Sequence, residues 1–600
     1  MPETILIAIA WPYANSDIHV GNITGSHLPG DICARYHRLR GRKVLMVSGS
    51  DAHGTAITIK ADQKGVSPME VYQHYHPRFI ELFTKLGISY DLFTSTHTAN
   101  HFDIAQKIFI VLKENGYLIT NISKQWYSTT QKRFLPDRYV EGTCYYCGNE
   151  DARSDQCEQC GHVLEAEKLV SPRSKLDGST PELRETEHYY LDLSGLEPKI
   201  KTFLQERESY WRPLVINQSL GMINTTGLKP TPITRDLDWG IPVTLEGWEG
   251  KCLYVWFEAV MGYLSAAIEW CDLNGNRDAW RDWWLNPESK CFYYIGKDNI
   301  TFHAVTWPAE LLGIRDGLDR KLGSPDPKAL VLPYNIPANE FMNLEGRKIS
   351  GSQNWAVWGL DALERYDPDA LRYYLTVAMP ETRDTDWDWE DFFQRNNNEL
   401  VATWGNLVNR VLSFTYKHWE GIIPAPEKLR ESDLILLQTI GGGFEKVGQL
   451  LEKVELRGAL AEAMALATEV NKYLDMHGPW FEIKTDRKEA EKTIYTAIQA
   501  IAWLSVMLSP FLPFTSQAVH EILDLGEPLF QEPQVEEVQD ELGSHQILLT
   551  RRTESDSERS DRWLPNKLVP GRKFKQPYPL FKKLDHKIVE EERDRLGAKS

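Results

Sequence analysis

The stretch that decides the fold is Trp11-Pro-Tyr-Ala-Asn-Ser-Asp-Ile-His-Val-Gly-Asn22, which follows the β-branched run Thr4-Ile-Leu-Ile-Ala-Ile-Ala10. The apolar run predicts a buried first strand, and the segment after Gly21 can begin a helix. The N–H groups and the dipole at a helix N-terminus favour a phosphate group. His19 can add a hydrogen-bond donor there, and Gly21 leaves no side chain between the backbone and a ligand. Taken alone, a His-x-Gly-Asn stretch is usually a turn, so the residues downstream decide its meaning.

Further strands and a helical half are expected downstream. Residues 44–47 are apolar and lead into Ser48-Gly-Ser-Asp-Ala-His-Gly-Thr55, which is typical of a ligand-facing loop at a strand end. Strand-like runs return at 251–256 and 291–296. After about residue 390 the apolar period becomes helical and continues to about 525. Residues 526–576 are polar, and we expect a loop or disorder there.

Composition limits the class of protein. The 600 residues include 67 Lys and Arg against 85 Asp and Glu, and this net charge of −18 argues against a general nucleic-acid binder. No apolar run approaches the ~20 residues of a membrane span, and no basic segment precedes the first apolar run, as a signal peptide would require. Eight cysteines are too few for a disulfide scaffold. We therefore expect a cytoplasmic protein of several domains without a membrane segment.

Four of the cysteines form a metal-binding pattern. Cys144, Cys147, Cys157 and Cys160 make up two CxxC pairs, each of which can place two sulfurs on one metal ion. Four thiolates satisfy tetrahedral zinc and leave no open position, so we expect a structural zinc site. An iron site or a thiol redox centre are the alternatives. The scattered cysteines are expected to be small buried hydrophobic residues.

A second phosphate-binding element is expected after the second half of the sheet. Residues 345–352 are Glu-Gly-Arg-Lys-Ile-Ser-Gly-Ser, in which Lys348 stands on a short loop between glycines. A mobile lysine of this kind can reach a pyrophosphate as charge develops in the transition state. The hydroxyl group of Ser350 can assist. Without the stretch around His19, a surface loop would be the simpler interpretation.

Together the two elements resemble the HIGH and KMSKS motifs of the class I aminoacyl-tRNA synthetases, and residues 12–15 resemble the methionine-specific family among them. The resemblance covers about residues 1–530. It implies ATP-dependent activation of L-methionine to methionyl-adenylate and transfer to tRNA(Met), with Mg²⁺ bound to ATP. It also implies a multidomain chain: an α/β Rossmann-type parallel-sheet catalytic domain with an inserted zinc-knuckle domain, followed by an α-helical bundle that binds the anticodon. The chain departs from the motifs at Asn22, where a second His is usual, and at Gly351, where a second Lys is usual.

The resemblance assigns roles residue by residue. Contacts to the reacting phosphate groups fall to His19, Asn22, Lys348 and Ser350. The ATP-binding positions are Tyr13, His19, Gly21, Asn22, Gly296, Lys348, Ile349 and Gly351. The methionine-binding positions are Ala10, Trp11, Tyr13, Asp51, Trp256, Ala259, Tyr263, Asp298 and His303. Asp51 would hold the ammonium group. Trp11 stands where Leu is common and Val260 where Pro is common, and any single aromatic residue of the set could instead belong to the core.

The helical half carries three residues that resemble the family's anticodon contacts. A Trp after a helix-breaking Pro, here Trp480, stacks on an anticodon base in this family, and such stacking is worth ~1–3 kcal/mol per base. Asn406 and Arg410 share one helix face and resemble the anticodon-reading pair. The alternatives are a core aromatic for Trp480 and a solvated helix face for the pair. The chain has no appended tRNA-binding β-barrel, through which some relatives dimerise, so we expect a monomer.

We divide the chain accordingly. Residues 1–115 and 231–325 are expected to form the two halves of the catalytic domain, and 116–230 the insertion with one zinc ion. The remaining divisions are 326–395 for the KMSKS-like loop and stem-contact region, 396–530 for the helical anticodon-binding domain, and 531–600 for a polar loop and C-terminal tail.

Two other functions compete with this interpretation. The first is a class I synthetase for another large apolar amino acid. Those for Leu, Ile and Val carry a long editing insertion, whereas the insertion here is mostly zinc knuckle and connecting strands. The second is a synthetase-like tRNA-binding protein that lost catalysis at Gly351 and Asn22, against which intact His19, Gly21 and Lys348 argue.

Overall fold

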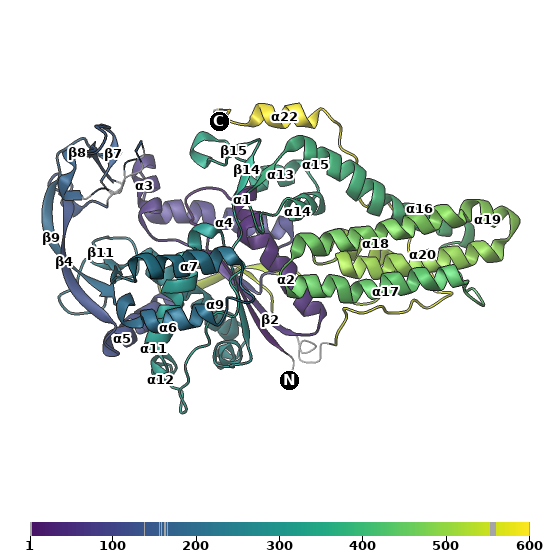
Figure 1. Ribbon diagram of the computed structural model, residues 1–600, viewed down its shortest axis with the longest axis horizontal. Helices are drawn as coiled ribbons and strands as arrows, with labels where there is room; N and C mark the ends of the chain where they lie inside the picture. The colour runs from purple at the N-terminus through teal and green to yellow at the C-terminus, as the bar shows by residue number, and fades with distance from the viewer. Residues whose placement is uncertain are drawn as a thin grey trace.

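The computed structural model describes residues 3–136, 139–154, 157, 159–160, 164, 166–551 and 560–598. Three parts follow one another along its long axis: an arm that carries the cysteines, a central α/β body and a bundle of long helices (Figure 1). Within the described residues, no helix is both long enough and apolar enough to cross a membrane.

The body is built on a six-stranded sheet in the order β13-β1-β2-β3-β18-β17. Its parallel part consists of β13 (Lys290–Tyr294), β1 (Thr4–Ile9), β2 (Lys43–Ser50) and β3 (Leu92–Ser95). Every residue of β1 is buried because helices cover both faces of the sheet, which explains the continuous apolar run in its sequence. The predicted parallel sheet is confirmed.

The two faces of the sheet belong to two hydrophobic cores. The odd-numbered isoleucines of β1 pack in one core with α2 (Leu28–Leu39) and α4 (Pro68–Leu86). The even-numbered side chains of β1 pack in the other core with α5 (Ala99–Glu114) and α9 (Gly262–Leu273). The other helices of the body are α3 (Thr55–Lys64), α6 (Leu193–Gln205), α7 (Pro213–Thr226), α10 (Arg281–Trp284), α11 (Trp307–Ile314) and α12 (Gly317–Lys321).

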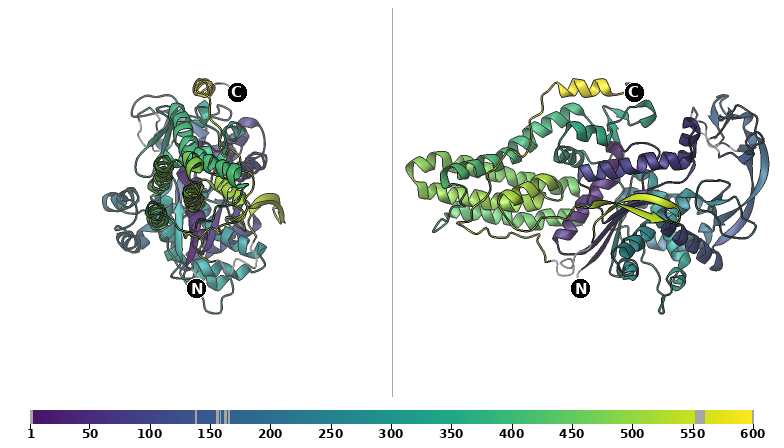
Figure 2. Two further views of the ribbon diagram at one scale, coloured as in Figure 1. Left: turned by 90° about the vertical axis from the view of Figure 1, so that its right-hand side faces the viewer. Right: turned by 180° about the vertical axis from the view of Figure 1, so that it is seen from behind.

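The expectation of a polar loop over 531–600, with loop or disorder over 526–576, is wrong in part. β17 (Gln534–Asp540) and β18 (Gly543–Leu549) form an antiparallel hairpin, and β18 pairs with β3 in the central sheet. The right-hand view of Figure 2 shows the hairpin lying across the body. Although the segment is polar overall, the last three residues of β18 are fully buried, so their packing against the sheet outweighs the composition.

The strand expected at 251–256 is also wrong in part. Only β12 (Cys252–Leu253) is extended, and α8 (Val255–Glu258) begins directly after Tyr254. β12 pairs with β11 (Thr234–Arg235) in a separate two-stranded sheet. Tyr254, Val255 and Trp256 favour a strand by propensity, but α8 leads through a short turn into α9, and this packing overrides the propensity.

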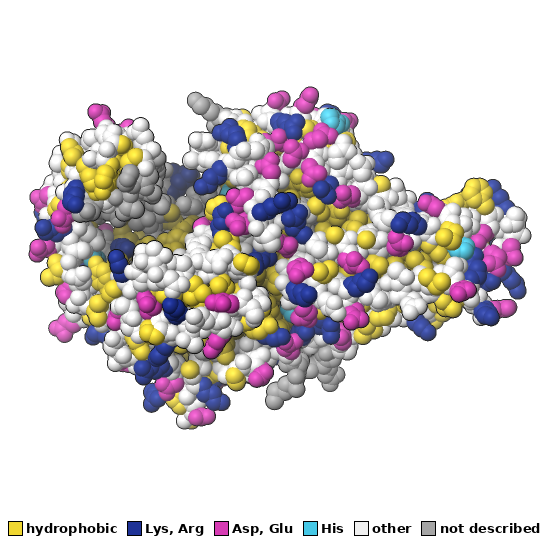
Figure 3. All heavy atoms as spheres, in the orientation of Figure 1, with side chains coloured by type: hydrophobic (Ala, Val, Ile, Leu, Met, Phe, Trp, Pro, Cys, Tyr) yellow, Lys and Arg dark blue, Asp and Glu magenta, His cyan; other side chains and the backbone are white. Residues whose placement is uncertain are grey.

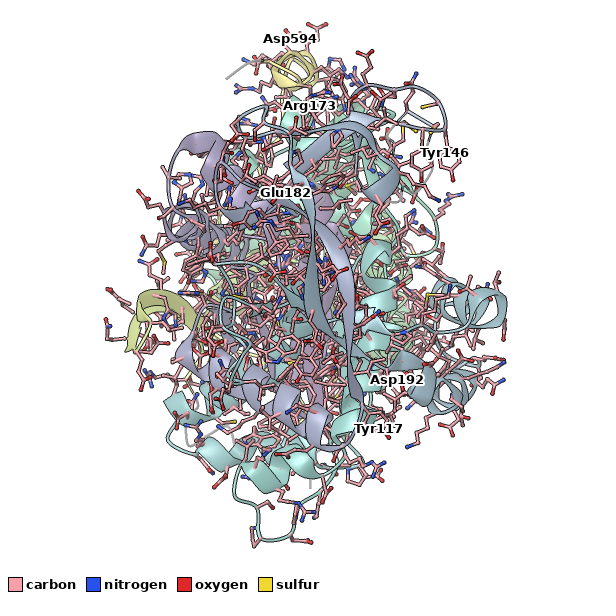
Figure 4. The ribbon with its side chains drawn as sticks, turned by 90° about the vertical axis from the view of Figure 1, so that its left-hand side faces the viewer. Tyr117, Tyr146, Arg173, Glu182, Asp192 and Asp594 are labelled. Atoms are coloured by element: carbon pink, nitrogen blue, oxygen red, sulfur yellow. The ribbon has the colours of Figure 1, made fainter. Side chains whose placement is uncertain are left out.

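The arm is a long antiparallel ribbon of β4 (Leu118–Ser128) and β9 (Glu182–Leu191). At its base the N–H of Asp192 donates to the carbonyl of Tyr117 at 2.9 Å, and the ribbon rises from there to Glu182 (Figure 4). The cysteines lie beyond its far end, beside a small sheet of β6 (Val140–Thr143), β7 (Ala152–Arg153) and β8 (Val170–Ser174).

A small sheet and several helices join the body to the bundle. The sheet consists of β14 (Met342–Leu344), β15 (Arg347–Lys348) and β16 (Thr385–Trp387). The helices are α13 (Gly359–Arg365), α14 (Pro368–Val377) and α15 (Trp389–Arg395). The last helix, α22 (Ile588–Arg595), returns to this region, where Arg593 donates to Glu345 at 3.0 Å. Helix α22 therefore lies beside the hairpin that carries the predicted catalytic lysine.

The bundle confirms the predicted helical half. Its helices are α16 (Asn406–Trp419), α17 (Glu431–Glu452), α18 (Leu456–His477), α19 (Pro479–Thr485), α20 (Arg487–Leu508) and α21 (Pro513–Ile522). Gly443 interrupts the apolar pattern of α17 for a physical reason. A Cβ there would overlap Leu466 and lie 3.1 Å from the sulfur of Met507, so the glycine lets three helices approach closely.

Candidate functional site

The predicted site lies at the carboxyl ends of β1, β2 and β13. From β1 the chain adds strands toward β3, whereas β13 lies on the other side of β1, so the order of strands reverses beside β1. Ligands of open α/β sheets bind at such a point. The loop after β1 spans both neighbours. The N–H of Ala10 donates to the carbonyl of Tyr294, and the N–H of Ala14 to the carbonyl of Asp51, each at 3.0 Å.

His19 is the N-cap of α1 (Val20–Asn22), so the helix begins one residue before Gly21 rather than after it. Its Nδ1 accepts a hydrogen bond from the N–H of Asn22 at 3.3 Å, and Oδ1 of Asn22 accepts from the N–H of His19 at 3.2 Å. Burial lowers the pKa of His19 to about 4, so the ring is neutral at pH 7. Because Nδ1 is an acceptor, the single ring proton is on Nε2, and this N–H is available to a ligand.

The lysine element at 345–352 and the residues that follow it contact the element around His19. The N–H of Val20 donates to the carbonyl of Val357 at 3.0 Å. Ile349 covers Gly21: a Cβ on Gly21 would lie 3.1 Å from Cδ1 of Ile349 and 3.0 Å from the ring of His19. The two motifs are far apart in the sequence, yet they occupy one place in the structure. The surface is hollowed between this place and the arm, and hydrophobic side chains gather in the hollow (Figure 3).

Lys348 stands on a β-hairpin rather than on an irregular loop. β14 and β15 are joined by Glu345 and Gly346, which both have positive φ, at 48° and 73°. The side chain of Lys348 is exposed, and its Nζ lies 5.8 Å from the centre of the Phe341 ring. Burial raises the pKa of Asp298, and the charge of Lys348 lowers it, so Lys348 lies near the residues that follow β13.

The structure explains why a glycine, rather than the second lysine of the family motif, stands at position 351. A Cβ at this position would lie 3.1 Å from Cη2 of Trp358, whose ring centre is 6.2 Å from that of His19. A lysine here would press the indole ring, so the glycine leaves room for Trp358. Sequence reasoning missed Trp358, because its position beside His19 depends on the fold. Ser350 lies next to Gly351, and its Oγ is 3.3 Å from Oγ of Ser352.

Asp51 is a buried carboxylate at the end of β2, with 3% of its surface exposed. Its Oδ1 accepts a hydrogen bond from the N–H of His53 at 3.3 Å. Burial, followed by the negative charge of Glu258, holds the pKa of Asp51 well above its usual range. An ammonium group beside Asp51 would counter both effects, so the site is suited to bind one.

Tyr263 and His303 form a fixed pair in the same region. The hydroxyl of Tyr263 donates to Nε2 of His303 at 2.7 Å, and Nδ1 of His303 donates to the carbonyl of Asn299 at 2.9 Å. Burial lowers the pKa of His303 to about 4, so its ring is neutral. The pair offers an apolar surface whose polar atoms are already satisfied, which suits a thioether side chain.

Trp256 lies between two other aromatic rings. It stacks on Phe302, with ring centres 4.2 Å apart, and meets Tyr13 edge to face at 5.8 Å. Ala259 follows on the turn between α8 and α9. At the end of β13, a Cβ on Gly296 would lie 2.7 Å from Oδ1 of Asp298, so the glycine allows the carboxylate to fold back over it.

Trp11 fits because two facing positions have no side chain. A Cβ on Gly49 would overlap the ring of Trp11, and a Cβ on Gly262 would lie 2.7 Å from it. The ring centre of Trp11 is 6.3 Å from that of Tyr263. Gly49 and Gly262 therefore make room for a Trp at position 11, where Leu is common in the family. Val260, the other departure, is buried in the core.

The four predicted cysteines come together at the end of the arm. Their sulfur atoms all lie within 4.8 Å of one another. The Sγ atoms of Cys144 and Cys160 are 3.8 Å apart, and those of Cys147 and Cys157 are 3.6 Å apart. Bonds of ~2.3 Å to a tetrahedral zinc ion place sulfurs ~3.8 Å from one another. The cluster therefore fits a metal ion such as zinc.

The three predicted anticodon residues lie on one side of the bundle. The guanidinium carbon of Arg410 is 4.6 Å from the centre of the Trp480 ring, which also meets Phe414 edge to face at 6.2 Å. Asn406 begins α16 and is exposed. Trp480 is half-buried, so part of its ring is covered and part is open to a ligand.

The comparisons with known families agree with this arrangement. The family model described as "tRNA synthetases class I (M)" matches residues 5–412, and that described as "Anticodon binding domain of methionyl tRNA ligase" matches residues 423–550. The methionine–tRNA ligase of Thermomicrobium roseum is 51% identical to this chain over 600 residues, which cover 100% of both chains. The chain belongs to the methionine–tRNA ligase family. This membership decides against the leucine, isoleucine and valine synthetases.

Other methionine–tRNA ligases extend the comparison. The ligase of Chloroflexus aurantiacus is 46% identical over 607 residues and is covered to 100%, as is this chain. The Mycobacterium tuberculosis methionyl-tRNA synthetase bound by methionyl-adenylate has the same fold, with a TM-score of 0.73 and 22% identity, over 97% of this chain and 100% of that chain. The Rossmann-type body and helical bundle are thus the architecture of these ligases.

Proposed function

We propose that this chain activates L-methionine with ATP to methionyl-adenylate and transfers the methionyl group to tRNA(Met). The observation that carries the proposal is the contact of the two motifs, in which Ile349 covers Gly21 beside His19. A strand-to-helix turn and a lysine hairpin that meet at the carboxyl ends of parallel strands suit the two sides of a nucleotide triphosphate.

Catalysis then consists of positioning and charge stabilisation. A carboxylate oxygen of methionine attacks the α-phosphorus of ATP, the bond to the β-phosphate oxygen breaks, and pyrophosphate leaves. No residue need act as a nucleophile. The Nε2–H of His19 and the side-chain amide of Asn22 are suited to donate to phosphate oxygens from one side. Lys348 and the hydroxyl of Ser350 are suited to stabilise the leaving pyrophosphate, and Mg²⁺ accompanies ATP.

Other residues of the predicted set complete the ATP site. Tyr13 and Gly296 lie where the adenosine part would reach the ends of β1 and β13. Ile349 and Gly351 flank the hydroxyl of Ser350. Only the positions of these four residues support an ATP-binding role. Each belongs to one of the loops that meet at the site.

The amino acid is proposed to bind between the loop after β1 and the α8–α9 helices. Asp51 holds the ammonium group, because it is a buried carboxylate beside a second negative charge. The thioether side chain packs among aromatic rings, on which sulfur packs well. The lining set is Ala10, Trp11, Tyr13, Trp256, Ala259, Tyr263, Asp298 and His303.

The tRNA is proposed to reach from this site to the bundle. Trp480 stacks on an anticodon base, while Arg410 and Asn406 donate hydrogen bonds to the same loop of RNA. The half-exposed ring of Trp480, with Arg410 over it, supports this role. The cysteine cluster holds one structural zinc ion at the end of the arm, and four thiolates leave no position open for catalysis. The domain boundaries, the cytoplasmic location and the monomeric state stay predictions.

The deciding experiment is pyrophosphate exchange into ATP with each of the twenty amino acids, followed by charging of tRNA(Met). Exchange that depends on methionine alone is expected. Exchange that responds to leucine or isoleucine and not to methionine would contradict the proposal. Binding of tRNA without exchange for any amino acid would favour the non-catalytic alternative.

A further inference from the structure

A cluster of buried polar side chains lies beneath the predicted amino-acid site, and the proposed reaction does not use it. At its centre is Glu258, the last residue of α8, whose side chain is fully buried. One carboxylate oxygen accepts a hydrogen bond from Nδ1 of His53 at 2.8 Å, and the other from Nε2 of His101 at 2.8 Å. Both oxygens are thus held by rings from two other parts of the body.

Each of these two histidines also contacts a predicted methionine-binding residue, His53 through its backbone and His101 through its ring. The backbone N–H of His53 donates to Oδ1 of Asp51 at 3.3 Å. The ring of His101 stacks with that of Trp11, with centres 6.4 Å apart and planes 29° apart. Glu258 itself lies two residues after Trp256 on the same helix. One carboxylate therefore connects the three segments that carry Asp51, Trp11 and Trp256.

The remaining contacts of the cluster fix the orientation of its rings. Nδ1 of His101 is 2.8 Å from Oγ of Ser265, whose hydroxyl also lies 3.1 Å from the carbonyl of Gly262. Nε2 of His53 is 3.1 Å from Nδ1 of His97. Because both imidazoles donate to the same carboxylate, neither ring can turn over without losing a hydrogen bond to a charged group, and such bonds are the stronger kind.

We propose that Glu258 is a positioning residue for the amino-acid substrate: held between His53 and His101, it sets the geometry and the charge of the pocket that receives the α-ammonium group. The inference rests on the proposed function. Glu258 acts through Asp51 and the aromatic rings and is not itself placed in contact with substrate. Its negative charge adds to that of Asp51, so the pocket favours a ligand with a cationic amine over one with a neutral amide nitrogen.

The titratable groups around Asp51 allow a pH test. They are Glu258 on α8, Tyr263 on α9 and His53 on the loop of Asp51, with His97 behind His53. Burial and Glu258 both raise the pKa of Asp51. A protonated Asp51 cannot bind an ammonium ion, so the KM for methionine should rise as the pH falls through that pKa. Removing the charge of Glu258 should lower the pKa of Asp51 and move this rise to lower pH.

The experiment compares Glu258→Gln and Glu258→Asp with the full-length wild-type protein in methionine-dependent pyrophosphate exchange between pH 5.5 and 8. Glu258→Gln is expected to raise the KM for methionine ~10-fold at pH 7, the effect of losing one hydrogen bond to a charged group. The KM for ATP should change little. The pH at which the KM for methionine rises should shift downward. Glu258→Asp keeps the charge and should keep the pH dependence of the wild type.

Glu269→Gln is the matched control. Glu269 is a largely buried carboxylate on α9 that accepts a hydrogen bond from Thr94 at 3.0 Å, and among the described residues its carboxylate makes no hydrogen bond to Glu258, His53 or His101. Its replacement should leave the KM for methionine and its pH dependence unchanged. If Glu258→Gln does not fold, His101→Gln removes the ring beside Trp11 while keeping an amide donor for Glu258, and it should raise the KM for methionine several-fold.

The outcomes separate the inference from the proposed function. A wild-type enzyme that exchanges pyrophosphate with methionine, together with Glu258 variants of normal KM and unshifted pH dependence, overturns the inference alone. Equal increases of KM for methionine and ATP with a lower melting temperature indicate a merely structural role and also overturn it. A wild-type protein that shows no exchange with methionine overturns both.

Discussion

Cδ1 of Ile349 lies 3.1 Å from the point at which a Cβ on Gly21 would stand. The residue after the predicted catalytic lysine therefore packs on the helix turn that His19 caps. This close contact is possible because position 21 has no side chain, and it brings the residue after Lys348 next to the turn of His19. Changes at this contact test the site most directly.

Replacing Gly21 with Ala should slow methionine-dependent pyrophosphate exchange. The added methyl group would stand 3.0 Å from the ring of His19 and 3.1 Å from Ile349, so one of them must move. The shift needed is a few tenths of an ångström, so the rate should fall by less than the roughly hundredfold that a ~1 Å displacement of a reacting group can cost. Gly25→Ala, in the π-helical turn Ile23–His27 that follows, is the control, because a Cβ there meets nothing within 4 Å. Equal activities of the two variants would contradict the contact between the motifs.

Replacing Lys348 with Ala should reduce kcat for adenylate formation far more than it raises the KM for methionine. A cation near pyrophosphate acts mainly in the transition state, and a contact of ~3 kcal/mol corresponds to about a hundredfold in rate. Arg347→Ala should lose much less, because the Arg347 guanidinium lies over the Trp355 ring at 4.1 Å. Steady-state exchange kinetics measure both. A normal kcat in the Lys348 variant would place catalysis in another loop.

Replacing Cys144 with Ser should remove the metal. Elemental analysis of protein purified without chelator should give one zinc ion per wild-type chain and less than that for the variant. The helical bundle lies at the opposite end of the molecule and should keep its circular dichroism (Figure 1). Cys33→Ala, a buried cysteine on α2, should retain the metal. Two zinc ions, or none, in the wild type would contradict the prediction.

Replacing Trp480 with Ala should raise the KM for tRNA roughly 5- to 150-fold, the loss of one stacked base at ~1–3 kcal/mol. Pyrophosphate exchange without tRNA should be nearly unchanged, because the ring is in the bundle and the chemistry is at the sheet. Phe481→Ala is the control. The Phe481 ring, next to Trp480 in the sequence, is 69% exposed and lacks the contact with Arg410 that Trp480 makes. A lower melting temperature with lost exchange would instead identify Trp480 as a core residue.

Acid should destabilise the protein below pH 6.5. Burial lowers the pKa of His27 to about 3 and that of His303 to about 4. In this window the unfolded chain binds protons that the folded chain does not, so the free energy of unfolding falls as the pH falls, by up to ~5 kcal/mol for His27 and ~3 kcal/mol for His303. Urea midpoints between pH 4 and 8 measure the slope. His27→Gln should reduce this slope.

The parts of the site that the sequence predicted are those that a short stretch of consecutive residues indicates. A strand followed by a helix N-terminus predicts the place of His19, a glycine-flanked loop that of Lys348, and two CxxC pairs that of the cysteines. Each of these signals is contained in fewer than twenty consecutive residues. The apolar run of β1 likewise predicts a buried strand.

The parts that the sequence did not predict depend on distant partners. Glu258 has no periodic signature, and its importance rests on His53 and His101, which other elements bring to it. Trp358 lies beside His19 only because the strand-like segment after the lysine hairpin returns there. The hairpin of β17 and β18 was missed because its polar composition concealed three buried residues, and its pairing with β3 has no local signal.

That pairing has a consequence for how the chain is made. β18 closes the free edge of β3 through contacts between Leu92 and Leu549 and between Phe93 and Leu548. During synthesis the first strands leave the ribosome long before residue 549 does, so the edge of β3 stays open while the insertion and the bundle are still being translated. An open apolar strand edge is a site of misassociation, and contacts of such sequence separation form slowly. The nascent N-terminal half therefore has a prolonged need for chaperone protection, which ends when its last strand arrives.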